Sequence, residues 1–155
     1  ADKTDILGLG MFILWQKSIT FLNICIFVFK LGLTFKAGTD DLRDSPSMDL
    51  IPKLIEYGSN IRAYDPQGID EARKKLEGPI VWCKDIYEAS ENVDAIIFMT
   101  EWSEFDSKNI DFNRIATLVK KKIIIDFRNM YKPYDITSLG FDYISLGRKV
   151  SRSID

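Results

Sequence analysis

A polar loop between an apolar segment and an amphipathic one carries the residues best suited to chemistry. Lys36 and Arg43 lie on either side of this loop, within residues 32–47. Ser45 followed by Pro46 predicts a helix N-cap with proline at the first helical position. The free amides and the dipole of a helix N-terminus favour an anion, so two nearby cations could seat a pyrophosphate. The alternative is a solvated loop with two ordinary surface charges.

The rest of the chain alternates short apolar segments with amphipathic ones. A first buried strand is expected in the apolar run that ends at Phe35, and a helix over residues 48–55 should be bent or shortened by Pro52. Further strands are expected at 60–64, 80–83, 95–99, 123–125 and 141–144, and further helices within 69–76, 86–89 and 110–119. This alternation predicts a single α/β domain: a Rossmann-like three-layer sandwich with a mostly parallel sheet.

In such a sheet, ligands bind beyond the carboxyl ends of the strands. The polar candidates at these ends are Asp65, Thr100, Glu101, Asp126 and Arg128. Asp65 precedes a proline and is expected to be a turn residue rather than a ligand.

Other candidates have a structural alternative beside the functional one. Arg43 could pair with a neighbouring aspartate instead of a ligand, and Glu101 and Trp102 could fix a helix start and the core instead of touching substrate.

Composition restricts the function further. The 155 residues are 46% apolar and 28% charged, which suits one domain with a real core. A net charge of −2 offers no basic field for nucleic acid, and Lys120 to Lys122 are expected at a helix C-terminus. Cys25 and Cys83 lie in apolar segments and are expected to be buried thiols in a reducing, cytoplasmic compartment. The absence of histidine removes the commonest general base and metal ligand, and no metal site is expected.

The N-terminal third is rich in apolar residues but is not expected to cross a membrane. Residues 18–29 form an uncharged stretch of only 12 residues, whereas a spanning helix needs about 20. A buried strand is therefore the preferred interpretation, and an N-terminal membrane or signal-like segment is the alternative.

Five segments together resemble a known family. They are Gly32 to Ser47, Ala63-Tyr64-Asp65-Pro66, Thr100 to Phe105, Ile125 to Asn129 and Ser145-Leu146-Gly147-Arg148. In order and approximate spacing they resemble the C-terminal UDP-binding domain of the UDP-glucose 6-dehydrogenase family, within the UDP-glucose/GDP-mannose dehydrogenase group. The resemblance covers about residues 24–150, so residues 1–23 are expected to be an atypical N-terminal segment and 151–155 a tail.

The resemblance implies roles for four residues. The positions of Phe35 and Lys36 contact the UDP-sugar in that family, and the position of Arg128 reaches a UDP-sugar across a subunit interface, which requires a homodimer. The position of Arg43 contacts NAD bound by another domain. Lysine suits a phosphate or a sugar hydroxyl, and arginine suits bidentate oxygen contacts.

The chain also departs from the family's pattern in two places. Residues 24–27 resemble its first strand, so Val28 to Leu31 look inserted and should lengthen or bulge that strand. Phe127 stands where the family usually has glycine, and is expected to crowd the backbone beside Arg128.

The family oxidises the sugar C6 alcohol twice, with two NAD and a cysteine in a Gly-x-Cys-Phe-x-Lys motif. No segment here matches that motif, so no catalytic residue is assigned and Cys83 is interpreted as a core thiol. The favoured hypothesis is the UDP-sugar-binding portion of such an enzyme, either as a fragment of it or as a chain that acts with a separate N-terminal NAD-binding chain. The alternatives are a non-catalytic nucleotide-sugar-binding module and a degraded remnant.

Overall fold

A parallel sheet flanked by helices forms the framework of the protein in a computed structural model, which describes residues 27–31, 42 and 45–154. The strands are β1 (Phe27–Leu31), β2 (Asn60–Tyr64), β3 (Ile80–Trp82), β4 (Ala95–Phe98), β5 (Ile123–Asp126) and β6 (Asp142–Ser145). The helices are α2 (Pro46–Glu56), α3 (Ile69–Lys75), α4 (Ile86–Ser90), α5 (Phe112–Leu118), α6 (Pro133–Thr137) and the 3-10 helix η1 (Ser103–Phe105).

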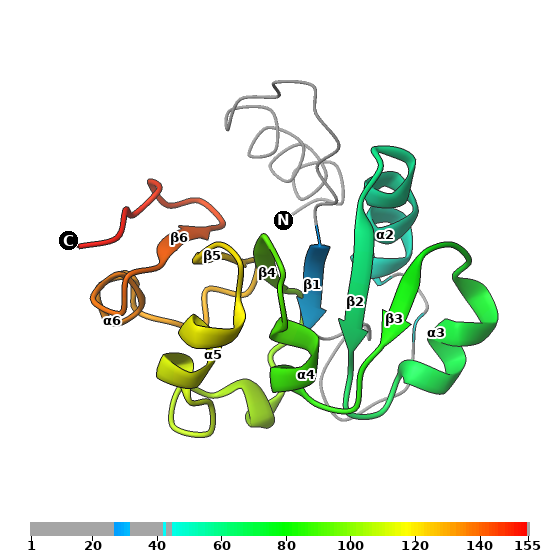
Figure 1. Cartoon of the computed structure of the whole chain (residues 1–155), viewed down its shortest axis with the longest axis horizontal. Coiled ribbons are helices and arrows are strands. Elements are labelled where there is room, and N and C mark those ends of the chain that lie inside the picture. The colour runs from blue at the N-terminus through cyan, green and yellow to red at the C-terminus, as the bar shows by residue number, and fades with distance from the viewer. Residues whose placement is uncertain (1–26, 32–41, 43–44, 155) are drawn as a thin grey trace.

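The sheet has the order β3-β2-β1-β4-β5-β6, and every neighbouring pair in it is parallel. Figure 1 shows β1 at the centre, between β2 and β4. The chain builds the sheet outward from β1 to β3 and then returns to place β4 on the other side of β1. This arrangement confirms the predicted α/β fold, and it creates a switch point between the carboxyl ends of β1 and β4.

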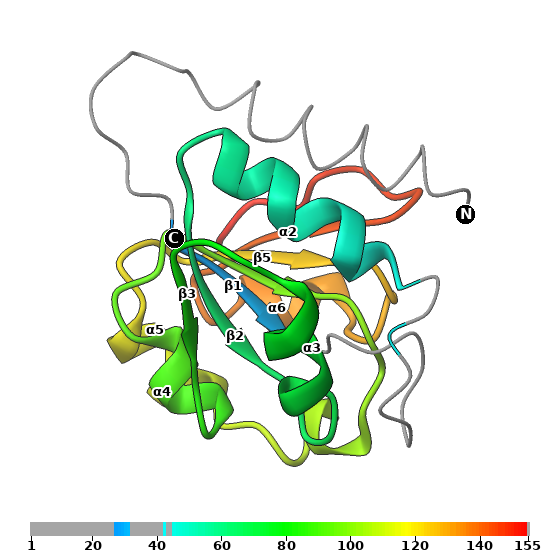
Figure 2. The same cartoon turned by 90° about the vertical axis from the view of Figure 1, so that its right-hand side faces the viewer.

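Two cores lie on opposite faces of the sheet because side chains alternate along each strand. Ile61 and Ile97 point to the face covered by α2 and α3, whereas Ile96 and Phe98 point to the face covered by α4, α5 and α6. Figure 2 shows α2 on one side of the sheet and α4 and α5 on the other. The predicted three-layer arrangement is therefore confirmed.

Strand β1 lies within the apolar run in which a first strand was expected. Its five residues, Phe27–Leu31, pair with Asn60–Tyr64 of β2 one for one, and Val28 to Leu31 pair in the same way with β4. The residues interpreted as an insertion thus form the strand itself, and the ladder has no bulge between Phe27 and Leu31. The expected strand at residues 24–26 and the end of the apolar run at 32–35 lie outside the described residues.

Helix α2 begins and ends where the sequence predicts. The Ser45 hydroxyl accepts a hydrogen bond from the Ser47 amide at 3.2 Å, and Pro46 occupies the first turn. The helix stops at Glu56, before Gly58 with φ +84°. Pro52 lies on an exposed surface inside the helix and does not shorten it, because α2 continues for a further turn.

The lysine run follows α5, as expected, but two of its side chains serve a buried carboxylate. The ammonium groups of Lys120 and Lys121 lie 3.7 and 3.3 Å from Oδ1 of Asp94, whose side chain is only 5% exposed. A buried charge needs such partners to offset its lost hydration. Lys120 and Lys121 therefore stabilise the start of β4 by pairing with the carboxylate that precedes it.

The C-terminal residues fold back on β6. Tyr143 and Ser151 exchange two backbone hydrogen bonds of 2.8 and 2.9 Å in an antiparallel bridge. The Arg152 guanidinium and the Ser153 amide both donate to the Asp142 carboxylate. The described part of the expected tail, residues 151–154, is thus bound to the outer strand of the sheet.

A cluster of edge-to-face aromatic pairs fills the core beneath α5. Tyr131 packs against Phe98 and Phe112, each with ring centroids 5.1 Å apart, and Phe98 packs against Phe105 at 6.0 Å. The Tyr131 hydroxyl donates a hydrogen bond to the carbonyl of Phe105 within this cluster. Tyr131 thereby links the segment after β5 to η1.

Replacing Tyr131 by phenylalanine should destabilise the fold. The change leaves the Phe105 carbonyl without this donor in a buried site, a loss of about 1 to 3 kcal/mol. Urea denaturation measures the free energy of unfolding. Tyr134→Phe is the matched control, because Tyr134 is 72% exposed, and it should change stability little. Equal effects of the two substitutions would contradict this assignment.

Stability should also fall with rising pH above about pH 9. Burial raises the pKa of the Cys83 thiol to about 11 and raises the pKa of Tyr131 above its ordinary value. In the unfolded chain these groups lose protons at about pH 8.5 to 10, so the unfolded state then binds fewer protons than the folded one. The stability that these two groups contribute is fully present below the pKa values they have in the unfolded chain. It is lost as pH rises through the higher pKa values they have in the folded protein.

Urea titrations between about pH 7 and pH 10.5 test this dependence. Cys83→Val removes one titrating group and should give a shallower fall in the free energy of unfolding. A stability profile that stays flat across this range would refute the prediction.

Candidate functional site

The carboxyl ends of the strands gather the polar residues that the sequence singles out. The segment that follows β1 begins at the switch point, and Phe35, Lys36 and Arg43 belong to it, but all three lie outside the described residues. On its far side, Leu42 and Ser45 are buried, and the Ser45 amide donates to the Leu42 carbonyl at 3.2 Å. The N-terminus of α2 is thus fixed to the core directly after that segment.

Asp65 is a turn residue, as predicted. Its carboxylate follows β2, is 2% exposed and accepts hydrogen bonds from the amides of Gln67 and Gly68 at 2.9 and 2.6 Å. The second oxygen lies 3.3 Å from the indole nitrogen of Trp102, which follows β4. Because β1 lies between β2 and β4, this contact joins the two loops that flank the carboxyl end of β1. Asp65 and Trp102 therefore shape the border of the switch point.

Trp102 and Glu101 are adjacent in the chain but differ in environment. The Trp102 side chain is buried in the aromatic core and precedes η1, so it takes the structural role that the sequence left open. The Glu101 side chain is 55% exposed, and its Oε2 lies 2.6 Å from Nε of Arg128. The ion pair joins the loops after β4 and β5, two candidates that the sequence lists separately.

The carboxylate of Asp126 organises the loop that carries Arg128. Asp126 ends β5 and is fully buried, and its Oδ1 accepts the Arg128 amide at 2.8 Å. Its Oδ2 accepts the amides of Met130 and Tyr131, at 2.7 and 3.3 Å, and the Tyr143 hydroxyl at 2.7 Å. A buried carboxylate with four donors is well compensated for its lost hydration. Asp126 is thus an anchor for the loop and has no exposed surface for a ligand.

Two further contacts fix the same loop to the end of β6. Asn129 adopts a left-handed conformation with φ 55°, and its side-chain amide donates to the Leu146 carbonyl at 3.2 Å. The Arg148 guanidinium lies 3.4 Å from the Tyr131 carbonyl. The backbone around Arg128 is therefore held from both β5 and β6.

Phe127 does not crowd the Arg128 loop, contrary to expectation. Its side chain is 5% exposed and packs in the core on the α2 face, and its amide donates to the Phe98 carbonyl at 3.0 Å. Its φ is not positive, so the position makes no demand for glycine. The hydrogen bond to Phe98 completes the last bridge between β4 and β5, and the loop begins after it.

The pKa of Tyr143 reflects its buried position in this network. Burial raises the pKa of its hydroxyl above the ordinary tyrosine value, and the hydrogen bond to Asp126 adds to the effect. The phenol therefore remains a proton donor to Asp126 at neutral pH. The sequence gives no local signal for this partner, because Tyr143 lies 17 residues further along the chain.

Cys83 is a buried thiol, as predicted, and is unsuited to nucleophilic chemistry. Its side chain is 2% exposed, its Sγ lies 3.6 Å from the Val81 carbonyl, and burial raises its pKa to about 11. The reactive form of a cysteine is the thiolate, which this environment disfavours.

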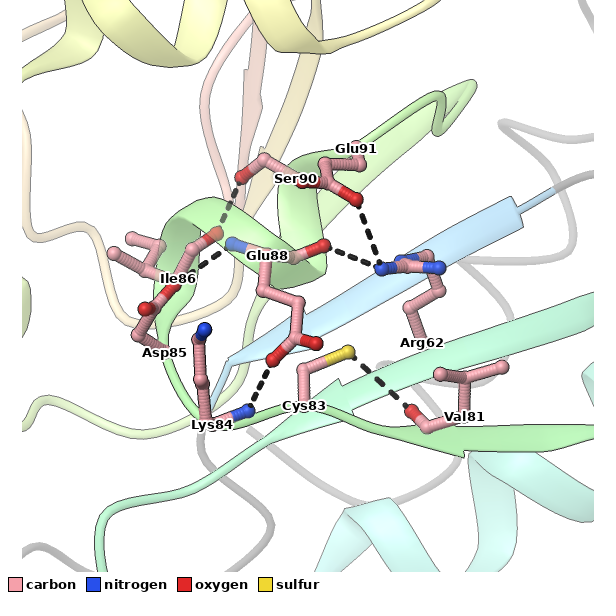
Figure 3. A network of polar contacts seen from close by, with 9 residues as sticks. All are labelled: Arg62, Val81, Cys83, Lys84, Asp85, Ile86, Glu88, Ser90 and Glu91. Carbon is pink, nitrogen blue, oxygen red and sulfur yellow. Dashed lines mark hydrogen bonds and ion pairs between the residues drawn. The ribbon is translucent and has the colours of Figure 1, made fainter.

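The surroundings of Cys83 are structural as well. Figure 3 shows the thiol beside Arg62, whose guanidinium donates to the Glu88 carbonyl at 2.6 Å and lies 3.6 Å from Glu91. Arg62 thus satisfies a carbonyl near the C-terminal end of α4. Cys25 lies outside the described residues.

The described residues contain neither a cluster of metal-ligating side chains nor a membrane-spanning helix. No group of three or more metal-ligating side chains occurs among residues 27–31, 42 and 45–154. Within the same ranges, no helix combines the length and apolar character needed to cross a membrane.

Comparison with known proteins agrees with this architecture. A UDP-glucose 6-dehydrogenase of Rhizobium meliloti is 42% identical over 118 residues, which are 76% of this chain and 26% of that protein. One from Rickettsia bellii is 40% identical over 121 residues, 77% of this chain and 27% of that protein. The chain thus spans about a quarter of the length of these curated relatives.

The fold has solved counterparts. The structure of a UDP-D-ManNAc dehydrogenase from Pyrococcus horikoshii superimposes on this chain with a TM-score of 0.69 at 26% sequence identity. The superposition covers 94% of this chain and 31% of the Pyrococcus chain. Residues 30–133 match the model of the UDP binding domain of the UDP-glucose/GDP-mannose dehydrogenase family. This match covers most of the strands and helices described above, from β1 to the start of α6. The chain therefore belongs to the UDP-glucose/GDP-mannose dehydrogenase family, as its UDP binding domain.

Proposed function

We propose that the chain binds a UDP-sugar at the carboxyl ends of β1 and β4. The observation that carries this proposal is the reversal of strand order at β1, where the family match also begins, at Lys30. Open α/β sheets bind nucleotides at such a switch point. The well-capped N-terminus of α2, whose dipole favours a phosphate, begins at the end of the same loop.

Within this site, Phe35 and Lys36 are proposed to contact the nucleotide sugar. Lys36 lies five positions after the last residue of β1, in the segment that begins at the switch point. A lysine ammonium is a compact charge that can donate to a phosphate or a sugar hydroxyl. The border of the site, formed by Asp65 and Trp102, is already held by internal hydrogen bonds, so these two are proposed to shape the site without binding the charge.

Arg128 is proposed as a second contact to the UDP-sugar, supplied across the interface of a homodimer. Its position supports this role, because its backbone is fixed by Asp126 while its side chain is 35% exposed beyond the carboxyl end of β5. A guanidinium on a rigid loop loses little backbone freedom when it binds an oxyanion.

The chain is further proposed to be one part of an NAD-dependent oxidation of a UDP-sugar such as UDP-glucose, carried out in the cytoplasm. NAD would bind mainly to another domain or chain, and Arg43 would contact it. The sequence after β1 supports this division, since Gly32 and Gly38 do not form a dinucleotide-binding fingerprint. The nucleophile is also proposed to come from elsewhere, because Cys83, the cysteine among the described residues, is buried and favours its protonated form.

Titration of the chain with UDP and UDP-glucose by calorimetry tests the site. Lys36→Ala should weaken binding by about 1 to 3 kcal/mol, the usual effect of losing a hydrogen bond to a charged group. Lys53→Ala is the matched control, since Lys53 is an exposed lysine in the last turn of α2, away from the carboxyl ends of the strands. Saturable binding that is equally strong in all three proteins would exclude Lys36 from the site, and a cooperatively folded chain that binds neither ligand would overturn the proposal.

Asp126→Asn tests whether the anchored loop matters for binding. The asparagine amide presents a donor to groups that now donate to Oδ2, so the loop should loosen and stability should fall by about 1 to 3 kcal/mol. Affinity for UDP-glucose should drop to a value near that of Arg128→Ala. Asp135→Asn, a change of the same type at an exposed position on α6, serves as the control. An unchanged affinity for UDP-glucose in Asp126→Asn would show that the loop anchored by Asp126 does not contribute to binding.

A further inference from the structure

The side chain and the backbone of Arg128 are held in different ways. The backbone is tied to the fully buried Asp126, with the amide 2.8 Å from Oδ1. The guanidinium is paired with Glu101 at 2.6 Å, and the two side chains are 35% and 55% exposed. The first contact is inaccessible to a ligand, whereas the second lies where solvent and solutes reach it.

Exposure determines how readily each contact can be exchanged. An ion pair between exposed side chains contributes little net stability, because water screens the charges and both side chains lose freedom. Breaking the pair is therefore inexpensive if another anion takes the place of the Glu101 carboxylate. A phosphate oxygen can replace that carboxylate oxygen, since guanidinium groups bind carboxylate and phosphate oxygens in similar geometry.

We propose that Glu101 is a resident anion on Arg128, which a phosphate oxygen of the nucleotide sugar displaces on binding. The inference rests on the proposed function and adds a specificity element to it. In the free protein the Glu101 carboxylate pairs with the guanidinium at Nε. Neutral sugars cannot displace a carboxylate from an arginine, so the pair selects for ligands that carry an anionic group. The replacement of the Glu101 carboxylate by a phosphate oxygen takes place on the Arg128 guanidinium. It is therefore the same whether the nucleotide is bound by the same copy of the chain or by its dimer partner.

The experiment measures the Kd of UDP-glucose by calorimetry for the 155-residue chain and four variants. Glu101→Gln removes the charge and keeps the shape, and Arg128→Ala and the double variant complete a thermodynamic cycle. Glu77→Gln removes one negative charge from an exposed residue between α3 and β3, at the opposite end of the strands, and controls for net charge.

At low ionic strength, about 0.05 M, Glu101→Gln should bind UDP-glucose about two- to five-fold more tightly than the wild type. The gain should shrink at about 0.5 M salt, where charges are screened. In the Arg128→Ala variant, Glu101→Gln should alter the Kd less than about two-fold, because the guanidinium for which Glu101 and the phosphate compete is absent. Glu77→Gln should bind as the wild type does, and the melting temperature of Glu101→Gln should be unchanged.

Each other result has a definite meaning. A wild-type chain that binds no UDP-glucose would overturn the proposed function and this inference with it. Wild-type binding that is unchanged or weaker in Glu101→Gln would overturn the inference alone. A gain that persists in the Arg128→Ala background, or that Glu77→Gln reproduces, would also overturn it by assigning the effect to general charge.

Discussion

The buried carboxylate of Asp126 is the constraint on which the candidate site depends. A charge with no exposed surface must find its compensation inside the protein, and here three backbone amides and one phenol provide it. These donors come from the loop after β5 and from β6, so a single side chain determines how two neighbouring strand ends are arranged. Tyr131 extends this network into the aromatic core, because its hydroxyl donates a hydrogen bond to the Phe105 carbonyl.

The molecule therefore combines a rigid backbone with exchangeable side chains at the carboxyl ends of its strands. The loops after β2, β4 and β5 are each held by buried hydrogen bonds that involve Asp65, Trp102 or Asp126. The side chains of the Glu101–Arg128 pair, by contrast, are exposed to solvent. This division fits a binding module, because a preorganised frame lowers the entropic cost of binding and exposed charges exchange partners at little cost.

Much of the fold could be predicted from the sequence, because buried parallel strands are short apolar runs and the helices between them are amphipathic. The turn at Asp65 and the start of α2 were also predicted, since aspartate before proline and serine before proline act locally. A first strand was predicted within the apolar run that ends at Phe35, but not its bounds. The run around it is apolar over many residues, so residue type alone does not locate the strand, which depends on pairing with β2 and β4.

The contacts of the site were harder to predict for a related reason. Glu101 and Arg128 come from different loops, and charge alone does not identify partners across the fold. Asp126 could have been recognised in part, because an aspartate at a strand end, followed closely by asparagine, is typical of a side-chain-capped turn. Tyr143 could not, since its role requires β6 to lie beside β5.

The return of the C-terminal residues along β6 has a consequence for solubility. An outer strand with unpaired amides and carbonyls is a template for association with other chains, and natural sheets protect such strands. Here the bridge between Tyr143 and Ser151, with Arg152 fixed to Asp142, occupies part of the outer side of β6. At the other margin, β3 presents only three residues. The sheet is thus poorly suited to self-association at both margins, and a chain cut after Arg148 would expose β6 to aggregation.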